Sequence, residues 1–398
     1  MTADAAVEST FYIKRLCRLC GGELEFGFSL GDQYISQFPL PEQYPTWPKV
    51  PLTLTMCRIC HLVQLLHTVP RDWLYREYFY RSATNESMVR ALGEIVVEAR
   101  SRVPLSSSDW VADIGANDGT LLDMYSVLGH TDWEDKSGKL IVPQRLAFEP
   151  AQNLQSELEG KCDVVVPDYF PPRKYDGPAC KVVTSVAMFY DLDSPDEFVK
   201  EMKRLLHKEG LWIIQYTDLR TMYEQNAWDS VCHEHLEYYS LRPVLHLLRR
   251  HGFGVEGFER NGVNGGSIRL YVRQGIRHSA EVEAEADREE VSGYYLLNRL
   301  HLYGIGLHAG VEKVRQYLDG KVVDLYGAST KGNTYLQVLG WPHFRQALER
   351  SKEKWGRTTV TGVLIVSEEE GRQDPAEVYL VLPWHFRGGI LEREKDLL

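Results

Sequence analysis

The sequence lacks any apolar run of 18 or more residues, so we expect no membrane-spanning helix. The start of the chain, MTADAAVESTFYIKRLC, has neither the basic residues nor the apolar core of a secretory signal, and a cytoplasmic location is expected. Positive charge is not in excess either: the formal net charge is −11, which argues against broad binding to nucleic acids or membrane surfaces. We therefore expect a small-molecule partner. An anionic one is compatible, because phosphate sites are built locally from backbone amides and one or two cations.

Cysteine is scarce and odd in number, with seven residues, which is a poor basis for a disulfide framework in a cytoplasmic chain. Four of the seven form two Cys-x-x-Cys pairs, Cys17 with Cys20 and Cys57 with Cys60. Each pair places two thiolates on one tight turn, and two such turns complete the tetrahedron that zinc prefers. We expect a structural zinc ion, since four cysteines leave no open coordination position. The alternative is two unrelated reduced pairs.

At 398 residues the chain is long enough for two or three domains, and three regions separate by pattern. We expect a zinc-binding domain over 1–90, an α/β domain over 91–278, and a helical linker with a smaller α/β domain over 279–398. Strands are predicted at 110–115, 145–150, 181–190 and 211–216, with GGSIRLYV (265–272) as a strand that closes the sheet edge. The segment DEFVKEMKRLLHKEG is predicted to be one amphipathic helix that stops at Gly210. The charged stretch 279–319 is predicted to be helical. No coiled-coil heptad or interface stripe indicates an oligomer, so a monomer is compatible with the sequence.

The segment 111–119, VADIGANDG, is typical of the first strand and glycine turn of an open parallel sheet, where a ligand sits against the backbone. The next predicted strand ends in Glu149, placed where a carboxylate can accept both ribose hydroxyls. The turn is D-I-G-x-N-D-G rather than G-x-G-x-x-G, which disfavours a nicotinamide oxidoreductase. With Glu149 it resembles class I S-adenosylmethionine-dependent methyltransferases. That resemblance implies cofactor contacts in four segments: Asp113, Gly115, Asn117, Asp118 and Gly119; Glu149; Asp168, Tyr169 and Phe170 around the adenine; and Ser185 and Met188. Solvated positions for Glu149 and Asp168 are the alternative.

The remaining motifs, together with the cysteine pairs and this turn, resemble one family, the sugar C-methyltransferases typified by the enzyme of tetronitrose biosynthesis. They are Tyr78–Ser82 with Asn85, Ala187–Asp191, Asp229–Tyr239, Asn264–Ser267, Tyr326–Asn333 and Leu382–Phe386, and they span almost the whole chain. The resemblance implies a zinc domain, a central class I methyltransferase domain with a doubly wound sheet, and a C-terminal Rossmann-like domain. It implies methylation of a carbon of a nucleotide-linked keto-deoxysugar, with S-adenosylmethionine and structural Zn²⁺ as cofactors. Ser82 and Asn85 are added to the expected cofactor contacts.

Methylation of carbon requires a base that removes a proton next to a ketone, and a group that stabilises the enolate oxygen. The segment His233-Glu234-His235 can supply both. The resemblance favours His235 as the base, with Glu234 beside it and with Tyr78 or Tyr80 closing over the substrate. Three alternatives remain: a metal site at Cys232–His235, a structural His235, and Cys232 as a small buried hydrophobic residue. Cys232 also stands where better-known members of the family carry tyrosine.

The turn Tyr326–Asn333 ends a predicted strand and opens a helix, so its amides could bind phosphate oxygens. The expected substrate contacts are Ser329, Lys331 and Asn333 there, Asn264 and Ser267 in the glycine turn, and His385 near the end of the chain. The alternatives are plain turns with a solvated Lys331, and Trp384 is expected in the core. The stretch TVTGVLIVSEEE lacks clear substrate-reading residues.

Two rival functions remain at the level of sequence. The same fold could methylate oxygen or nitrogen of a sugar or other natural-product acceptor, in which case no ketone is needed. A zinc-dependent scaffold with a decayed methyltransferase domain is a rival from another class. The intact glycine turn and Glu149 argue against decay. The sequence does not indicate the sugar, the nucleotide, the atom methylated or the stereochemistry.

Overall fold

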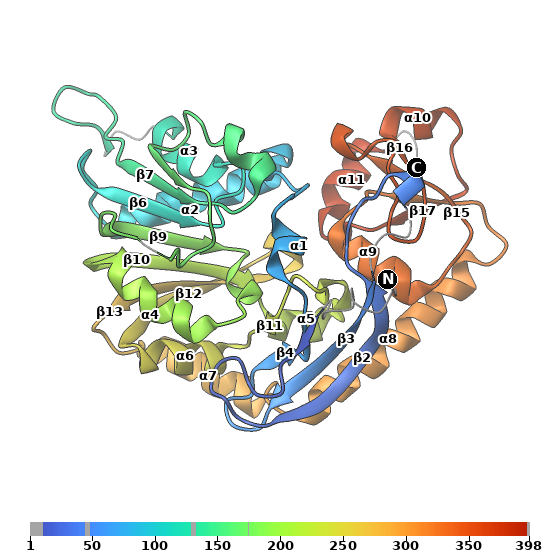
Figure 1. The fold of residues 1–398 in the computed structure, drawn as a ribbon, viewed down its shortest axis with the longest axis horizontal. Helices are drawn as coiled ribbons and strands as arrows, with labels where there is room; N and C mark the ends of the chain where they lie inside the picture. Colours follow the sequence, from blue (N-terminus) through green and yellow to red (C-terminus); the bar gives the residue numbers. More distant parts are fainter. Residues whose placement is uncertain (1–10, 44–47, 129–132, 174, 396–398) are drawn as a thin grey trace, which may run out of the picture.

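The computed structural model describes residues 11–43, 48–128, 133–173 and 175–395. Three larger sheets, arranged as three lobes around a central space, make up the molecule (Figure 1). In the described chain, no helix is long and apolar enough to cross a membrane. The first ten residues, on which the prediction of no secretory signal depends, lie outside the described residues.

The central lobe is a seven-stranded sheet in the order β12-β13-β10-β9-β6-β7-β8. Its strands are β6 (Trp110–Ile114), β7 (Gln144–Phe148), β8 (Val164–Val166), β9 (Cys180–Val186), β10 (Leu206–Thr217), β12 (Phe253–Asn261) and β13 (Ser267–Gln274). The five strands from β8 to β10 run parallel, whereas β13 and β12 join antiparallel to their neighbours. The strand order reverses between β6 and β9, the place where open α/β sheets bind ligands.

Helices cover both faces of this sheet, because the residues of the parallel strands are apolar on both sides. Leu211 and Ile213 pack with α2 (Glu86–Arg102) and α3 (Thr120–Val127) on one face. Trp212 and Ile214 point to the other face, which is covered by α4 (Pro195–Leu205) and α6 (Leu241–Arg250). The predicted α/β class with a central doubly wound sheet is confirmed.

Two local predictions in this lobe are wrong. The helix expected to reach Gly210 ends at Leu205, and β10 begins at Leu206 by pairing with Cys180. A side chain at Gly210 would lie 2.8 Å from Leu206, so the glycine serves an irregular strand rather than a helix end. The strand expected at the sheet edge, β13, lies inside the sheet, and the unpredicted β12 forms the edge.

The N-terminal lobe is built on a four-stranded antiparallel sheet in the order β11-β4-β3-β2. Its strands are β2 (Leu24–Tyr34), β3 (Lys49–Cys57), β4 (Val63–Leu65) and β11 (Glu237–Tyr238). A small second sheet joins β1 (Tyr12–Ile13) to β5 (His67–Thr68), and α1 (Arg71–Tyr75) follows. Because β11 directly follows the His-Glu-His segment, this sheet holds a piece of chain that belongs in sequence to the central lobe.

The C-terminal lobe has a four-stranded parallel sheet in the order β16-β15-β14-β17. Its strands are β14 (Val323–Tyr326), β15 (Phe344–Glu349), β16 (Ile365–Ser367) and β17 (Val378–Val381), with α9 (Thr330–Leu339), α10 (Glu368–Gln373) and α11 (Arg387–Arg393). This is the Rossmann-like arrangement that the sequence predicts.

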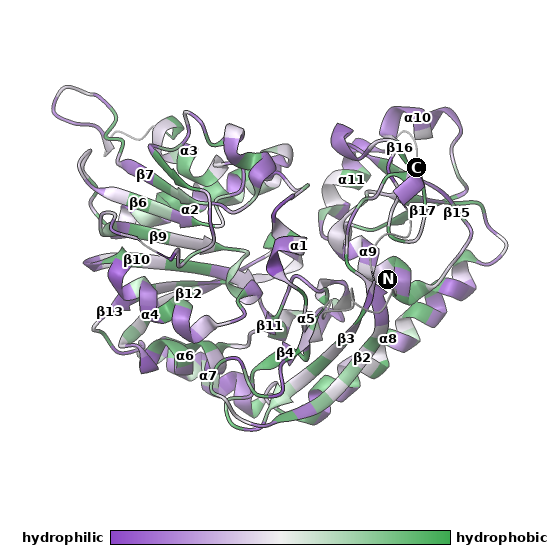
Figure 2. Ribbon diagram, viewed as in Figure 1, coloured by the Kyte–Doolittle hydropathy of each residue, from purple (hydrophilic) through white to green (hydrophobic). Residues whose placement is uncertain are grey.

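Two helices connect the lobes: α7 (Ala280–Val291) and the long α8 (Leu297–Leu318), with α5 (Leu219–Gln225) nearby. Figure 1 shows α8 running beneath β2 toward the C-terminal lobe. The approach is close because Gly27 of β2 meets Leu300, and Gly304 of α8 meets Phe28. Figure 2 shows alternating hydrophilic and hydrophobic bands on α8, as expected for a helix buried on one face, and a hydrophilic α10.

Candidate active site and zinc site

The four paired cysteines come together at the end of the N-terminal sheet. Their sulfur atoms all lie within 4.8 Å of one another, with 3.5 Å between Cys17 and Cys60 and between Cys20 and Cys57. A tetrahedron of zinc–sulfur bonds of about 2.3 Å needs sulfur atoms separated by about 3.8 Å. The geometry therefore fits a structural zinc ion, and the alternative of two unrelated pairs is excluded.

The zinc turns are built into the packing of the central lobe. Gly22 lies against the Cys57 sulfur, where a side chain would come within 2.9 Å. The fully buried guanidinium of Arg18 pairs with Asp193 at 2.6 Å and lies 3.8 Å from Glu237 of β11. The Leu19 carbonyl accepts a bond of 2.7 Å from Arg250 of α6. The turn that zinc would order therefore contacts β11, which follows the His-Glu-His segment, and α6, which covers the central sheet.

A cavity of about 1250 Å³ lies among the three lobes. It is lined by the glycine turn after β6, the aromatic segment after α1, the His-Glu-His segment and the start of α9. Of the predicted site residues it brings together Tyr78, Tyr80, Ser82, Asp113, Gly115, Asn117, Glu149, Asp168, Tyr169, Phe170, Met188, Glu234, His235, Asn264, Ser329, Lys331 and His385.

The glycine turn opens one end of this cavity. Gly115 has a φ of +74°, and a side chain there would lie 3.3 Å from Met188. The Glu149 carboxylate accepts bonds from the amides of Asn117 at 2.7 Å and Ala151 at 2.8 Å. Burial raises the pKa of Glu149 to about 7, and these two amides oppose the rise. An open backbone turn beside a carboxylate with remaining lone pairs fits a ribose, so these residues fit S-adenosylmethionine.

Asp113 lies in β6, the strand next to β7, and comes directly before the glycine turn. Its Oδ1 accepts a bond of 2.6 Å from the Thr184 hydroxyl. Burial raises the pKa of Asp113 to about 8, and the charge of Glu149 adds to the rise. The pair Asp113 and Glu149 is therefore held by short bonds at the ends of adjacent strands.

The segment expected around the adenine forms the neighbouring wall. Asp168 Oδ1 accepts the amide of Tyr169 at 2.8 Å, and Phe170 packs edge-on against Phe148 with ring centroids 5.1 Å apart. The Arg71 guanidinium stacks 3.8 Å above the Tyr169 ring. The Tyr169 ring, the Arg71 guanidinium and the Asp168 carboxylate together form a surface suited to a flat polar ring such as adenine.

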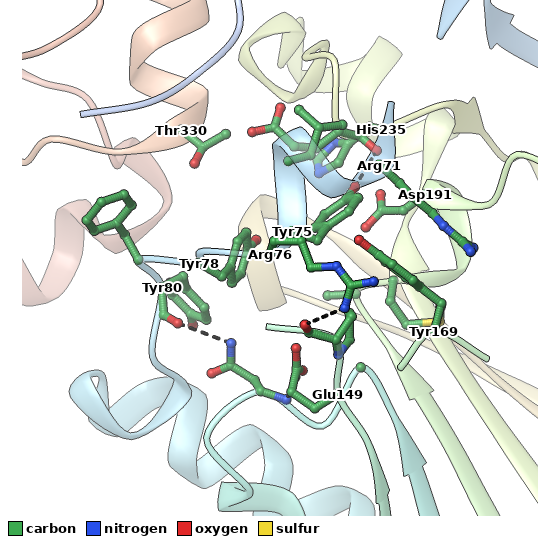
Figure 3. Close-up of a pocket in the computed structure, with 18 of the residues that line it drawn as sticks. Arg71, Tyr75, Arg76, Tyr78, Tyr80, Glu149, Tyr169, Asp191, His235 and Thr330 are labelled. Atoms are coloured by element: carbon green, nitrogen blue, oxygen red, sulfur yellow. Dashed lines mark hydrogen bonds between the residues drawn. The ribbon is translucent and has the colours of Figure 1, made fainter. Parts of the chain in front are cut away.

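His235 lies at the far end of the cavity from Glu149, with Tyr75 and Tyr78 between them in Figure 3. Its Nδ1 lies 2.8 Å from the Ser230 carbonyl. A carbonyl only accepts hydrogen bonds, so Nδ1 carries the proton and Nε2 keeps a lone pair. Burial lowers the pKa of His235 to about 3, and the positive charge of Lys331 contributes, so the imidazole is neutral at physiological pH.

The two neighbours of His235 in the motif behave differently. Glu234 lines the cavity, and burial raises the pKa of its carboxyl to about 7. His233 points away from the cavity, and its Nε2 lies 3.1 Å from the Val50 carbonyl of β3. In the described chain, the four zinc cysteines are the cluster with metal-ligand geometry, so the alternative metal site at Cys232–His235 is not formed.

The aromatic segment after α1 closes one side of the cavity. Tyr78 exchanges two bonds with the Asn153 amide, at 3.0 and 2.9 Å. Asn117 donates to the Tyr80 carbonyl at 3.1 Å (Figure 3) and accepts the Ser82 amide at 3.0 Å. Arg81 joins Glu157 of the central lobe to Glu353 of the C-terminal lobe. The segment is therefore tied to both lobes across the cavity.

The C-terminal lobe contributes the start of α9. Ser329 caps this helix by accepting the Gly332 amide at 3.0 Å, and Lys331 donates to the Asn264 carbonyl at 3.2 Å. Burial lowers the pKa of His385 to about 3, and the charge of Lys331 adds to this. Trp384, expected in the core, is only half-buried: it packs against Gly265 and donates to Asp229 at 2.8 Å, between two lobes.

Seven predicted site residues lie outside the cavity lining: His233, Asp118, Gly119, Asn85, Ser185, Ser267 and Asn333. Each has a local structural task instead. Asp118 and Gly119 begin α3, and Asn85 caps α2. Ser185 accepts the Trp212 ring N–H at 3.1 Å, and Ser267 donates to the Val263 carbonyl at 2.8 Å. Asn333 joins α9 to the N-terminal lobe through Ser36 and Gln37.

Several lining residues were not predicted as site residues. Tyr75, Tyr190, Asp191, Arg71, Thr330, Lys354 and Arg357 are among them. Tyr190 packs 4.3 Å from the His235 ring centroid. Tyr190 and Asp191 lie in the motif Ala187–Asp191, so the sequence contained a signal for them. Lys354 and Arg357 lie just before the stretch TVTGVLIVSEEE, in which the sequence showed no clear substrate-reading residues.

Comparisons with known proteins match the chain in three consecutive parts. A zinc binding domain model matches residues 17–75, a methyltransferase domain model 88–256, and a C-methyltransferase C-terminal domain model 262–398. The C-methyltransferase NovU of Streptomyces niveus is 25% identical over 367 residues, which cover 87% of this chain and 84% of NovU.

Two solved methyltransferase structures are similar over about half of the chain. An S-adenosylmethionine-dependent methyltransferase from Clostridium acetobutylicum ATCC 824 has a TM-score of 0.36 and 10% identity, over 47% of this chain and 92% of that one. Magnesium protoporphyrin IX methyltransferase from Synechocystis PCC 6803, solved with S-adenosylmethionine, has a TM-score of 0.34 and 10% identity, over 47% and 79%.

Proposed function

We propose that this chain, a zinc-binding, S-adenosylmethionine-dependent C-methyltransferase, methylates a carbon next to the ketone of a nucleotide-linked keto-deoxysugar. The observation that carries this proposal is a neutral histidine, His235, whose Nε2 lone pair is free in the cavity that also holds Glu149 and the glycine turn. Methylation of carbon needs such a base, because the carbon becomes a nucleophile only after it loses a proton.

The site residues support separate roles in cofactor and substrate binding for the three regions, 1–90, 91–278 and 279–398. The glycine turn, Glu149 and Asp168–Phe170 would hold the cofactor. Bound S-adenosylmethionine supplies a methyl group attached to a positively charged sulfur, which reacts with a carbon nucleophile. The sugar would lie between this turn and His235, covered by Tyr78 and Tyr80.

In the proposed reaction, Nε2 of His235 takes the proton from the carbon beside the ketone. The electron pair of that C–H bond forms a C=C bond, and the carbonyl oxygen takes up the negative charge. The carbon would then form a bond to the methyl group while the methyl–sulfur bond of the bound cofactor breaks with its electron pair left on sulfur, and the ketone would be restored. The Ser230 carbonyl stabilises the imidazolium that forms, because it accepts a hydrogen bond from Nδ1–H before and after the proton transfer.

The nucleotide part of the substrate would lie at the start of α9. Ser329, Thr330 and Lys331 line the cavity there, and amides at a helix start favour phosphate oxygens. A diphosphate beside Lys331 would offset the charge that lowers the His235 pKa. The bound substrate would therefore increase the basicity of the group that acts on it.

The second candidate is methylation of oxygen or nitrogen on a natural-product acceptor. The same neutral His235 could deprotonate a hydroxyl group, and the cofactor site would be unchanged. The two candidates differ in one respect: only carbon methylation needs an exchangeable C–H bond beside a ketone.

The test is solvent deuterium exchange into a panel of nucleotide-linked 4-keto-6-deoxysugars, with S-adenosylhomocysteine present so that methyl transfer cannot occur. We expect exchange at the carbon beside the ketone, its loss in His235→Ala, and nearly unchanged S-adenosylmethionine affinity in that variant by calorimetry. His308→Ala, an exposed position on α8, is the matched control and should exchange like the wild type. Absence of exchange with every sugar, together with tight cofactor binding, would favour oxygen or nitrogen methylation.

A further inference from the structure

Two carboxyl groups that line the cavity each have one oxygen atom without a hydrogen-bond partner in the described chain. Asp191 Oδ1 and Glu234 Oε2 are both buried, and within the described chain neither atom makes a hydrogen bond. Glu234 is only 6% exposed. Buried polar atoms are nearly always paired, so an unpaired carboxyl oxygen in a cavity is a group that a ligand would satisfy.

Asp191 lies between the cofactor turn and the base. It ends a short 3-10 helix, Phe189–Asp191, that follows β9, and Met188 at its start lies against Gly115. The preceding Tyr190 packs against His235, and its carbonyl accepts the Leu236 amide at 2.8 Å. Figure 3 shows the Asp191 carboxyl group pointing toward Tyr75. The Tyr75 hydroxyl donates to the Glu234 carbonyl at 2.9 Å.

The surroundings of Asp191 favour the uncharged form of its carboxyl group. Burial raises its pKa well above the usual range, and the charges of Glu234 and Glu237 add to the rise, while the Tyr75 hydroxyl opposes it. The other ionisable groups that face it are Tyr78 and Tyr190 and, from the His-Glu-His segment and β11, Cys232 and Tyr238. None of these groups is a cation, so the protonated acid, which can donate a hydrogen bond, is favoured.

We propose that Asp191 is a catalytic acid of this enzyme, whose carboxyl group donates a hydrogen bond to the ketone oxygen of the substrate while the neighbouring carbon is deprotonated. This inference rests on the proposed function and adds the electrophilic partner of His235. The thiol of Cys232 does not line the cavity, so position 232 supplies no donor to that oxygen.

The chemistry balances without any further reactant. As His235 Nε2 takes the carbon-bound proton, the C–H electron pair moves into the C=C bond and the carbonyl π pair moves onto oxygen. The Asp191 hydroxyl hydrogen stays bonded to the carboxyl group and strengthens its contact with this oxygen. Donors aimed at a developing oxyanion in a water-poor site typically contribute about 10²–10³-fold to the rate.

The experiment compares deuterium exchange into the sugar accepted by the wild type, with S-adenosylhomocysteine present, for Asp191→Ala and Asp191→Asn. Asp191→Ala should slow exchange about 10²-fold, as for the loss of one oxyanion donor. Asp191→Asn keeps a neutral donor and should stay within about tenfold of the wild type. Asp319→Asn, an exposed position after α8, is the control and should be unchanged.

The pH profile separates a catalytic role from a structural one. Wild-type exchange should fall at alkaline pH as the Asp191 acid ionises, and this decline should be absent in Asp191→Asn, whose amide does not titrate. A decline that persists in Asp191→Asn would assign it to another group, such as Glu234, and overturn the proposal. So would wild-type rates in Asp191→Ala.

The two levels of failure are distinguishable. If the wild type exchanges no sugar, the proposed function fails and this inference fails with it. If the wild type exchanges and Asp191→Ala exchanges equally well, only the role of Asp191 fails. Cofactor affinity and thermal unfolding of each variant, measured in parallel, identify a loss of rate that comes from misfolding.

Discussion

Burial shifts the pKa of single residues in the cavity toward their uncharged forms. The pKa of His235 is lowered to about 3, whereas that of Glu234 is raised to about 7. A neutral imidazole has a lone pair that can accept a proton, although its lowered pKa makes it a weaker base, and a protonated carboxyl group can donate a hydrogen bond. The ammonium of Lys331 is the charge that acts on both His235 and His385.

Replacement of Lys331 by glutamine should raise the pKa of His235. The positive charge disfavours the imidazolium, so its removal favours protonation, although burial, the larger cause, keeps the pKa below 6.5. Nuclear magnetic resonance of labelled histidine would follow the titration. Inorganic diphosphate should raise the same pKa in the wild type. Lys313→Gln, on the exposed part of α8, is the control, and an unchanged His235 pKa in Lys331→Gln would contradict the electrostatic account.

At the scale of elements, the carboxyl ends of the parallel strands place the site residues of the central lobe. Parallel strands β6, β7 and β9 end side by side, so Gly115, Glu149 and Met188 converge although they are far apart in sequence. The turn after β6 needs a left-handed backbone at Gly115, and a glycine there also leaves room for a ligand. The local sequence thus sets the turn, and the sheet order sets its neighbours.

Gly115→Ala should weaken S-adenosylmethionine binding as well as stability. The left-handed backbone costs an alanine about 1–2 kcal/mol, and the new Cβ would lie 3.3 Å from Met188 in the cavity wall. We expect at least a tenfold rise in the cofactor Kd, about 1.4 kcal/mol, measured by calorimetry. Gly160→Ala is the matched control: its φ is +77° and no atom lies within 4 Å of the added Cβ. It should lose stability alone, and equal affinities in both variants would argue against a cofactor site at Gly115.

At the scale of the whole molecule, the three lobes are joined through shared elements rather than loose linkers. Strand β11, which follows His235, pairs with β4 of the N-terminal sheet. Zinc-site residues Cys17, Cys57 and Cys60 belong to the same hydrophobic core as Trp212 of the central sheet. The zinc ion is therefore expected to hold the His-Glu-His segment in place without taking part in the reaction.

Loss of zinc should loosen the His-Glu-His segment. In Cys17→Ser, we expect reduced zinc content, a lower Tm, and faster amide hydrogen exchange in β4 and β11, because the knuckle carrying Arg18 loses its anchor. Cys162→Ser is the control, since Cys162 is outside the cluster. Full stability of Cys17→Ser without zinc, or unchanged exchange in β11, would contradict the structural role.

Only some of the residues that line the cavity were predicted from the sequence. Motif positions predicted Gly115, Glu149 and His235, and all three line the cavity. The same resemblance suggested Ser185 and His233, but the packing around each side chain decides which neighbour it meets. Ser185 therefore bonds Trp212, and His233 bonds β3. Asp191 was within a recognised motif, yet the burial of its unpaired Oδ1 beside Tyr75 of α1 depends on packing between lobes that no local pattern contains.

The sequence by itself determined the fold class, the zinc ligands and the cofactor turn, because these depend on local spacing: two thiolates on each turn, and a glycine where the backbone must be left-handed. Only the tertiary structure decided that β12 forms the sheet edge, that Arg18 contacts the segment of His235, and that Tyr75 and Asp191 share a cavity with Lys331. These relations join residues distant in the chain. They are set by strand order and by packing between lobes, and the pKa shifts follow from the burial that this packing creates.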